Sequence, residues 1–122
     1  MLIVKDLSVQ RLEKTIFENI RLSLSPRNII FLKGKNGSGK TTLLKAILNI
    51  IEPSFGSIYW KGKLLKKNLY DFYNHVTYIP DTTTSLKKLT ITDNINIWKK
   101  FFISDINNAQ IETALRTLKL DN

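Results

Sequence analysis

Apolar and polar residues alternate along the first part of the chain. Residues 2–9 and 15–24 both follow this pattern, and the charged stretch 11–14 separates them. Alternation is typical of strands that bury one face, so the sequence predicts two antiparallel strands joined by a turn. The run Ile-Ile-Phe-Leu at residues 29–32 is apolar throughout, which predicts a central strand buried on both faces.

A helical period follows this run. Between residues 41 and 51 the apolar positions fall on one helix face, and Pro53 ends the pattern. These positions are Leu43, Leu44, Ile47, Leu48 and Ile51. Residues 57–60 and 76–79 predict two more strands, and the second is a buried candidate that Pro80 closes. Residues 92–102 and 106–120 predict two helices, and Asp105 is the expected N-cap of the second. Since strands and helices are both predicted, the expected fold class is α/β.

Composition limits the class of protein. The chain has 122 residues, enough for one small domain, and 19 Lys and Arg against 10 Asp and Glu give a net charge of +9. Nucleic acid, an anionic membrane face and phosphate ligands all fit that charge. The lysines are scattered and no base-reading motif is present, which argues against nucleic acid. Without cysteine there is no disulfide framework, and the first residues do not resemble a signal peptide.

The stretch GKNGSGKTT fits the pattern G-x-x-x-x-G-K-[ST] and lies between a predicted strand and a predicted helix. Backbone amides at a helix start bind anions, and glycines let them approach phosphate oxygens closely. We expect Lys40 to reach the β- and γ-phosphates, Thr41 to bind Mg²⁺ and Thr42 to offer a second hydroxyl. The predicted nucleotide-binding residues are Gly34, Lys35, Asn36, Gly37, Ser38, Gly39, Lys40, Thr41 and Thr42.

The order of these features resembles the nucleotide-binding domain of an ABC transporter. Two antiparallel strands precede NGSGKTT, and EPSFGSIYWKGK, a strand ending in YIP, and LTITDNI follow it. Within that family, TLLKAILNIIEPSFGSIYWKG and LTITDNINIWKKF are similar to the ATP-binding subunit of the haem exporter of cytochrome c maturation. The resemblance implies a P-loop NTPase core with ATP and Mg²⁺ at residues 1–90 and the start of a helical subdomain at residues 91–122.

Other site residues follow from the resemblance, and some depart from the family pattern. Arg11 stands where the family usually places an aromatic residue on adenine, and its guanidinium plane can stack in the same way. Asp81 and Thr82 stand where the family has a glutamine, so Asp81 is a candidate Mg²⁺ contact and coupling to the membrane partner is in doubt. The alternative for Arg11 is an exposed arginine in a turn, and the alternative for Asp81 is a Pro-Asp turn without a metal contact. His75, the only histidine, is interpreted as structural or surface-exposed.

Three family elements have no match in these 122 residues: the signature loop, the apolar strand ending in Asp-Glu, and the switch histidine. Two domains of the family sandwich ATP between a P-loop and the opposing signature loop. We therefore expect a P-loop core cut short before the signature region, with no catalytic residue and no meaningful hydrolysis of its own. The expected partners are transmembrane transporter subunits and a second nucleotide-binding domain, at the cytoplasmic face of the inner membrane.

Several other functions stay open at this point. One is a non-catalytic remnant or regulatory fragment that binds ATP weakly or not at all. Another is the ATPase subunit of a different ABC transporter. A small P-loop kinase would need lid arginines, and only Arg116 follows residue 79. A basic nucleic-acid binder would lose its affinity steeply as salt rises.

Overall fold

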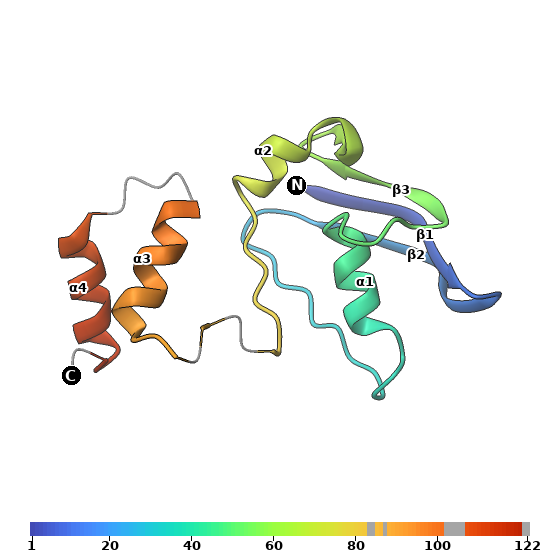
Figure 1. Cartoon of the computed structure of the whole chain (residues 1–122). Helices are drawn as coiled ribbons and strands as arrows, with labels where there is room; N and C mark the ends of the chain where they lie inside the picture. Colours follow the sequence, from blue (N-terminus) through green and yellow to red (C-terminus); the bar gives the residue numbers. More distant parts are fainter. Residues whose placement is uncertain (83–84, 87, 102–106, 121–122) are drawn as a thin grey trace. The chain divides into compact units, whose positions relative to one another are not determined.

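The computed structural model describes residues 1–82, 85–86, 88–101 and 107–120. They divide into two compact units, Met1–Thr77 and Tyr78–Asn122. Strands and the first helices make up the first unit, and two longer helices make up the second (Figure 1). The structure is therefore mixed α/β, which confirms the predicted fold class.

An antiparallel sheet forms the body of the first unit. Its strand order is β2 (Lys14–Leu24), β1 (Leu2–Arg11), β3 (Phe55–Trp60) and β4 (Lys63–Leu64). The predicted hairpin is confirmed, because β1 and β2 pair antiparallel through a two-residue turn whose residues have φ angles of 45° and 61°. Two positive φ angles give the turn the twist that the flanking strands need.

One helix, α1 (Lys40–Ile47), packs against β1 of the sheet (Figure 1). It ends at Ile47, four residues before the predicted end. Asn49 takes a left-handed φ of 55°, and the amides of Asn49 and Ile50 donate to the carbonyls of Ala46 and Lys45. This is a Schellman motif, so the left-handed Asn49 ends the helix before Pro53 can.

The core of the first unit is apolar. The 3-10 helix η1 (Leu65–Lys67) and the short helix α2 (Leu69–Tyr73) follow the sheet in the chain, and each contributes a buried residue to this core. The Tyr73 hydroxyl donates to the Leu48 carbonyl at 2.8 Å, which ties α2 to the end of α1. The buried apolar residues are Val4, Leu7, Val9, Leu43, Ala46, Leu48, Ile58, Leu65 and Phe72.

Two predicted buried strands do not form. Residues 29–32 and 76–79 carry no strand assignment, and Ile29, Phe31 and Ile79 are 78%, 79% and 86% exposed. A strand needs a neighbour to satisfy its backbone amides and carbonyls. The sheet in the described part of the chain contains β2, β1, β3 and β4 alone, so neither run has a pairing partner there.

Capping interactions fix the second unit. Helix α3 (Ile91–Phe101) begins after Thr90, whose amide and hydroxyl both donate to the Asp93 carboxylate while the Asp93 amide donates back to the hydroxyl. Helix α4 (Asn108–Thr117) has Asn107 as its N-cap in a capping box; the predicted cap, Asp105, lies outside the described residues. Among the residues described, no helix is long and apolar enough to cross a bilayer.

The buried Asn94 anchors the turn before α3. Its Oδ1 atom accepts from the Leu86 amide at 2.7 Å. Its Nδ2 group lies within hydrogen-bond distance of the carbonyls of Leu86, Leu89 and Thr90, at 3.2, 3.3 and 2.9 Å. One side chain thus lies within hydrogen-bond distance of four backbone groups, which belong to Leu86, Leu89 and Thr90.

Candidate phosphate-binding loop

Backbone geometry explains two glycines of the loop between residue 33 and α1. Gly39 is the N-cap of α1 with a left-handed φ of 87°, and a Cβ there would lie 2.8 Å from Cγ2 of Ile16. Gly37 has a φ of 79° and open space around it. Both positions favour glycine because L side chains rarely adopt such angles. Gly39 therefore lies close against Ile16 of β2. No pattern in the sequence predicts this contact.

Lys40 folds back over the loop. Its ammonium donates to the carbonyls of Gly34 and Lys35 at 2.8 and 2.7 Å. The loop itself is a tight turn, in which the Ser38 amide donates to the Lys35 carbonyl at 3.2 Å. A Cβ on Gly34 would lie 2.8 Å from the Ser38 hydroxyl, so glycine also allows this close approach. The charge of Lys40 is thereby held at the rim of the loop.

The start of α1 is suited to an anion. The helix has no side-chain cap and no acidic residue in its first turn. Its first intrahelical hydrogen bond runs from the Leu43 amide to the Gly39 carbonyl at 2.8 Å, so the amides of residues 40–42 have no partner within the helix. Free amides, the positive end of the helix dipole and a nearby ammonium all favour phosphate oxygens.

The threonines of the motif lie on the first turn of α1. Thr41 is exposed, and Thr42 is half-buried. The Thr41 hydroxyl is therefore open to a metal ion that a bound nucleotide would bring. Among the described residues no three His, Cys, Asp or Glu side chains gather into a metal-binding group. The Thr41 hydroxyl and phosphate oxygens are ligands of the kind that Mg²⁺ prefers.

Arg11 ends β1 and pairs with Lys14 across the hairpin. It is exposed, and Lys14 lies two residues from Ile16, the residue that Gly39 contacts. At about 3.3 Å per residue, the hairpin end lies about 7 Å along β2 from that contact. The structure thus brings Arg11 to the same end of the sheet as the loop.

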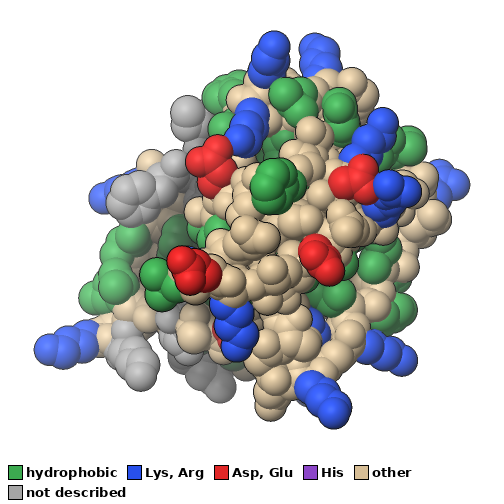
Figure 2. All heavy atoms as spheres, turned by 90° about the vertical axis from the view of Figure 1, so that its right-hand side faces the viewer, with side chains coloured by type: hydrophobic (Ala, Val, Ile, Leu, Met, Phe, Trp, Pro, Cys, Tyr) green, Lys and Arg blue, Asp and Glu red, His purple; other side chains and the backbone are tan. Residues whose placement is uncertain are grey.

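Two other residues were singled out in the sequence. Asp81 is exposed and belongs to the second unit, whereas the loop belongs to the first, so its role as an Mg²⁺ contact stays a prediction. His75 is half-exposed and takes part in a polar network with Lys61 and Asp71. Lys and Arg side chains are spread around the face that Figure 2 shows, and they do not gather into one patch on it.

A family model described as "ABC transporter" matches residues 17–122. The cytochrome c biogenesis ATP-binding export protein CcmA of Vibrio vulnificus is 31% identical over 98% of this chain and 58% of its own length. The ABC-type transporter ATP-binding protein EcsA of Bacillus subtilis is also 31% identical, over 80% of this chain and 39% of its own. The chain thus spans little more than half of the CcmA relative.

Solved structures agree with the fold. The ATP-binding subunit of an ABC transporter superposes with a TM-score of 0.78 at 26% identity, over 99% of this chain and 51% of that one. The ATP-binding cassette MJ0796, solved as a dimer bound to ADP and Pi, has a TM-score of 0.73 over 98% of this chain and 56% of its own. At 19% identity, that second likeness supports the fold alone.

Proposed function

Because this chain belongs to the ABC transporter family, we propose that residues 34–42 bind the triphosphate of Mg²⁺-ATP. The observation that carries the proposal is the position of Lys40, whose ammonium lies 2.8 and 2.7 Å from two loop carbonyls beside the unpartnered amides of α1. A triphosphate placed there would meet one cation and several N–H donors without any rearrangement of the sheet.

Each residue of the motif has a role in this proposal. Gly37 and Gly39 allow the positive φ angles that turn the amides toward the phosphates. Lys40 contacts the β- and γ-phosphates, and Thr41 gives one oxygen to Mg²⁺. Arg11, at the same end of the sheet, stacks on the adenine ring. Asp81 contacts Mg²⁺ directly or through water.

We further propose that the transporter is the haem exporter of cytochrome c biogenesis. The support is the CcmA protein of Vibrio vulnificus, which is 31% identical to nearly the whole of this chain. A different ABC transporter is the alternative, because EcsA is as similar over a shorter stretch. In either case residues 1–90 would be part of the ATP-binding core, and residues 91–122 would begin the helical subdomain.

The proposed location is the cytoplasmic face of the inner membrane. The chain would lie at the surface of the inner membrane, bound to transmembrane subunits, and would dimerise with a second nucleotide-binding domain. The dimer of MJ0796 with ADP and Pi is the structural precedent, taken from that protein. ATP hydrolysis belongs to the whole family member in this proposal. The present 122 residues are expected to bind nucleotide without turnover.

Nucleotide titration tests the site. We expect a fluorescent ATP analogue to bind the full chain with Mg²⁺, and Lys40→Ala to weaken binding by about tenfold or more, since charged hydrogen bonds contribute about 1.5–3 kcal/mol. Lys45→Ala is the matched control, because Lys45 lies in the last turn of the same helix. Equal binding by the Lys40→Ala and Lys45→Ala variants would contradict the proposed site, and Lys40-dependent phosphate release would contradict the expected lack of turnover.

A further inference from the structure

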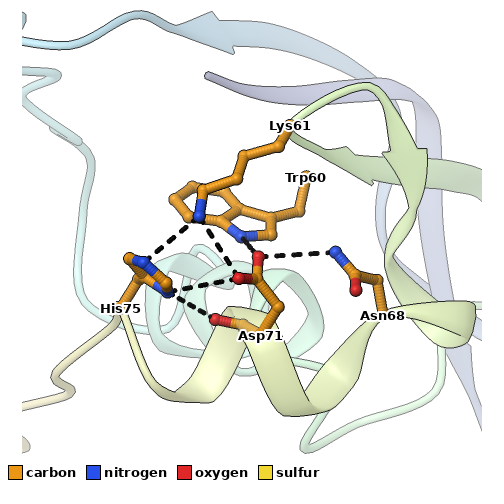
Figure 3. A network of polar contacts seen from close by, with 5 residues as sticks. All are labelled: Trp60, Lys61, Asn68, Asp71 and His75. Carbon is orange, nitrogen blue, oxygen red and sulfur yellow. Dashed lines mark hydrogen bonds and ion pairs between the residues drawn. The ribbon is translucent and has the colours of Figure 1, made fainter.

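A polar network joins β3 to α2 on the side of the first unit that Figure 3 shows. The Asp71 carboxylate is its centre. One oxygen, Oδ2, accepts from the Trp60 indole at 2.7 Å and from the side-chain Nδ2 group of Asn68 at 3.5 Å. The other, Oδ1, lies 3.3 Å from the Lys61 ammonium and 3.6 Å from Nδ1 of His75. Two side chains that can both carry positive charge therefore face one oxygen.

The neighbours of His75 fix the position of its proton. Its Nδ1 atom lies 2.7 Å from the Asp71 backbone carbonyl, which can only accept, so Nδ1 carries hydrogen. Its Nε2 atom lies 3.2 Å from the Lys61 ammonium, which can only donate, so Nε2 presents its lone pair. Both contacts select the same neutral form of the ring. The contacts drawn in Figure 3 therefore fit the neutral ring with its hydrogen on Nδ1.

We propose that this network is a proton-operated exchange of cations at Asp71. When a proton joins Nε2 of His75, Lys61 loses its acceptor there and faces a second positive charge across 3.2 Å. The Nδ1–H group keeps the Asp71 carbonyl, and the imidazolium takes over the charge pairing with Oδ1. Lys61 then moves into solvent and gives up its cation–π contact with Trp60, whose ring centre lies 5.5 Å from the ammonium. Apart from the proton that joins Nε2, only non-covalent contacts change.

The surroundings make the exchange feasible. The side chains of Lys61 and His75 are 45% and 48% exposed, so Lys61 can swing into water and a proton can reach the ring. Met1, the first residue of the chain, lines the same cavity as His75, and its carbonyl accepts from the Lys61 backbone amide at 3.0 Å. That backbone bond holds the base of Lys61 in place while its side chain moves.

The chain offers a direct measurement, because His75 is its only histidine. In the ¹⁵N-labelled full chain we expect the neutral ring to carry its proton on Nδ1. We expect the signals of the Lys61 side chain to move with the same midpoint as the His75 ring on going from about pH 8 to about pH 5. A neutral ring protonated on Nε2, or Lys61 signals that ignore the His75 titration, would overturn the proposal. Both readouts use the unmodified chain, so neither depends on a variant folding.

Variants separate the exchange from a general effect of charge. Lys61→Met should raise the midpoint of the His75 titration, because a cation 3.2 Å from Nε2 is removed. Lys63→Met is the matched control, an exposed lysine two residues away, and should leave the midpoint unchanged. His75→Gln should abolish the response of Lys61. Equal midpoints in the Lys61→Met and Lys63→Met variants would count against the proposal.

Discussion

Replacing Gly39 with alanine tests how the loop is built against β2. The left-handed φ of 87° costs an alanine about 1–2 kcal/mol. The new Cβ would also lie 2.8 Å from Cγ2 of Ile16, and overpacking of this kind costs about 1–3 kcal/mol. We therefore expect Gly39→Ala to lower the free energy of unfolding by about 2–5 kcal/mol, measured by urea denaturation followed by circular dichroism.

Two comparisons divide that loss between backbone strain and collision. Gly37→Ala meets a similar φ of 79° with nothing within 4 Å, so it should cost only the strain, about 1–2 kcal/mol. In an Ile16→Ala background the collision is removed, and the further cost of Gly39→Ala should fall to that same strain. Equal losses for Gly37→Ala and Gly39→Ala, or no relief from Ile16→Ala, would refute the argument that Ile16 sets the position of the loop.

Two further predictions concern single side chains. Burial raises the pKa of Asp71, but the Trp60 indole and then the Lys61 ammonium outweigh it, so the folded pKa lies below the ordinary value. The stability that results is present above the ordinary pKa, about 3.9, and is lost as the pH falls through the lowered pKa. Between neutral and acid pH, the melting temperature should therefore fall less in Asp71→Asn than in the parent chain. Asn94→Ala should destabilise the second unit by about 2–4 kcal/mol, because it removes the side-chain partner of the Leu86 amide and of the Leu89 carbonyl, whereas the Leu86 and Thr90 carbonyls keep backbone donors. Hydrogen exchange at residues 86–94 would measure this loss, and the exposed Asn96→Ala is the control.

The sequence predicts those parts of the fold that local pattern controls. Alternation of apolar residues predicts the β1–β2 hairpin, and a helical period predicts α1 and α4 to within a few residues. The nine-residue motif also predicts where the loop lies and which helix follows it. These features depend on residues close together in the chain, so their signals survive in the sequence alone.

Features that depend on distant partners were not predictable in the same way. The runs 29–32 and 76–79 have the composition of buried strands, but pairing requires a neighbour that the described part of the sheet does not supply. The contact between Gly39 and Ile16 joins residues far apart in the chain. Asn49 ends α1 through a left-handed conformation that asparagine adopts only in some contexts.

The exposed run at residues 29–32 has a consequence for how the chain behaves in concentrated solution. Four apolar side chains, 41–79% exposed, lie on a segment without strand pairing, which is a template for association between copies. A net charge of +9 keeps such copies apart at low ionic strength. Because about 0.15 M salt limits that repulsion to about 8 Å, added salt should lower the solubility of this chain, as light scattering against salt concentration would show. Its own positive charge would then act as the barrier to aggregation.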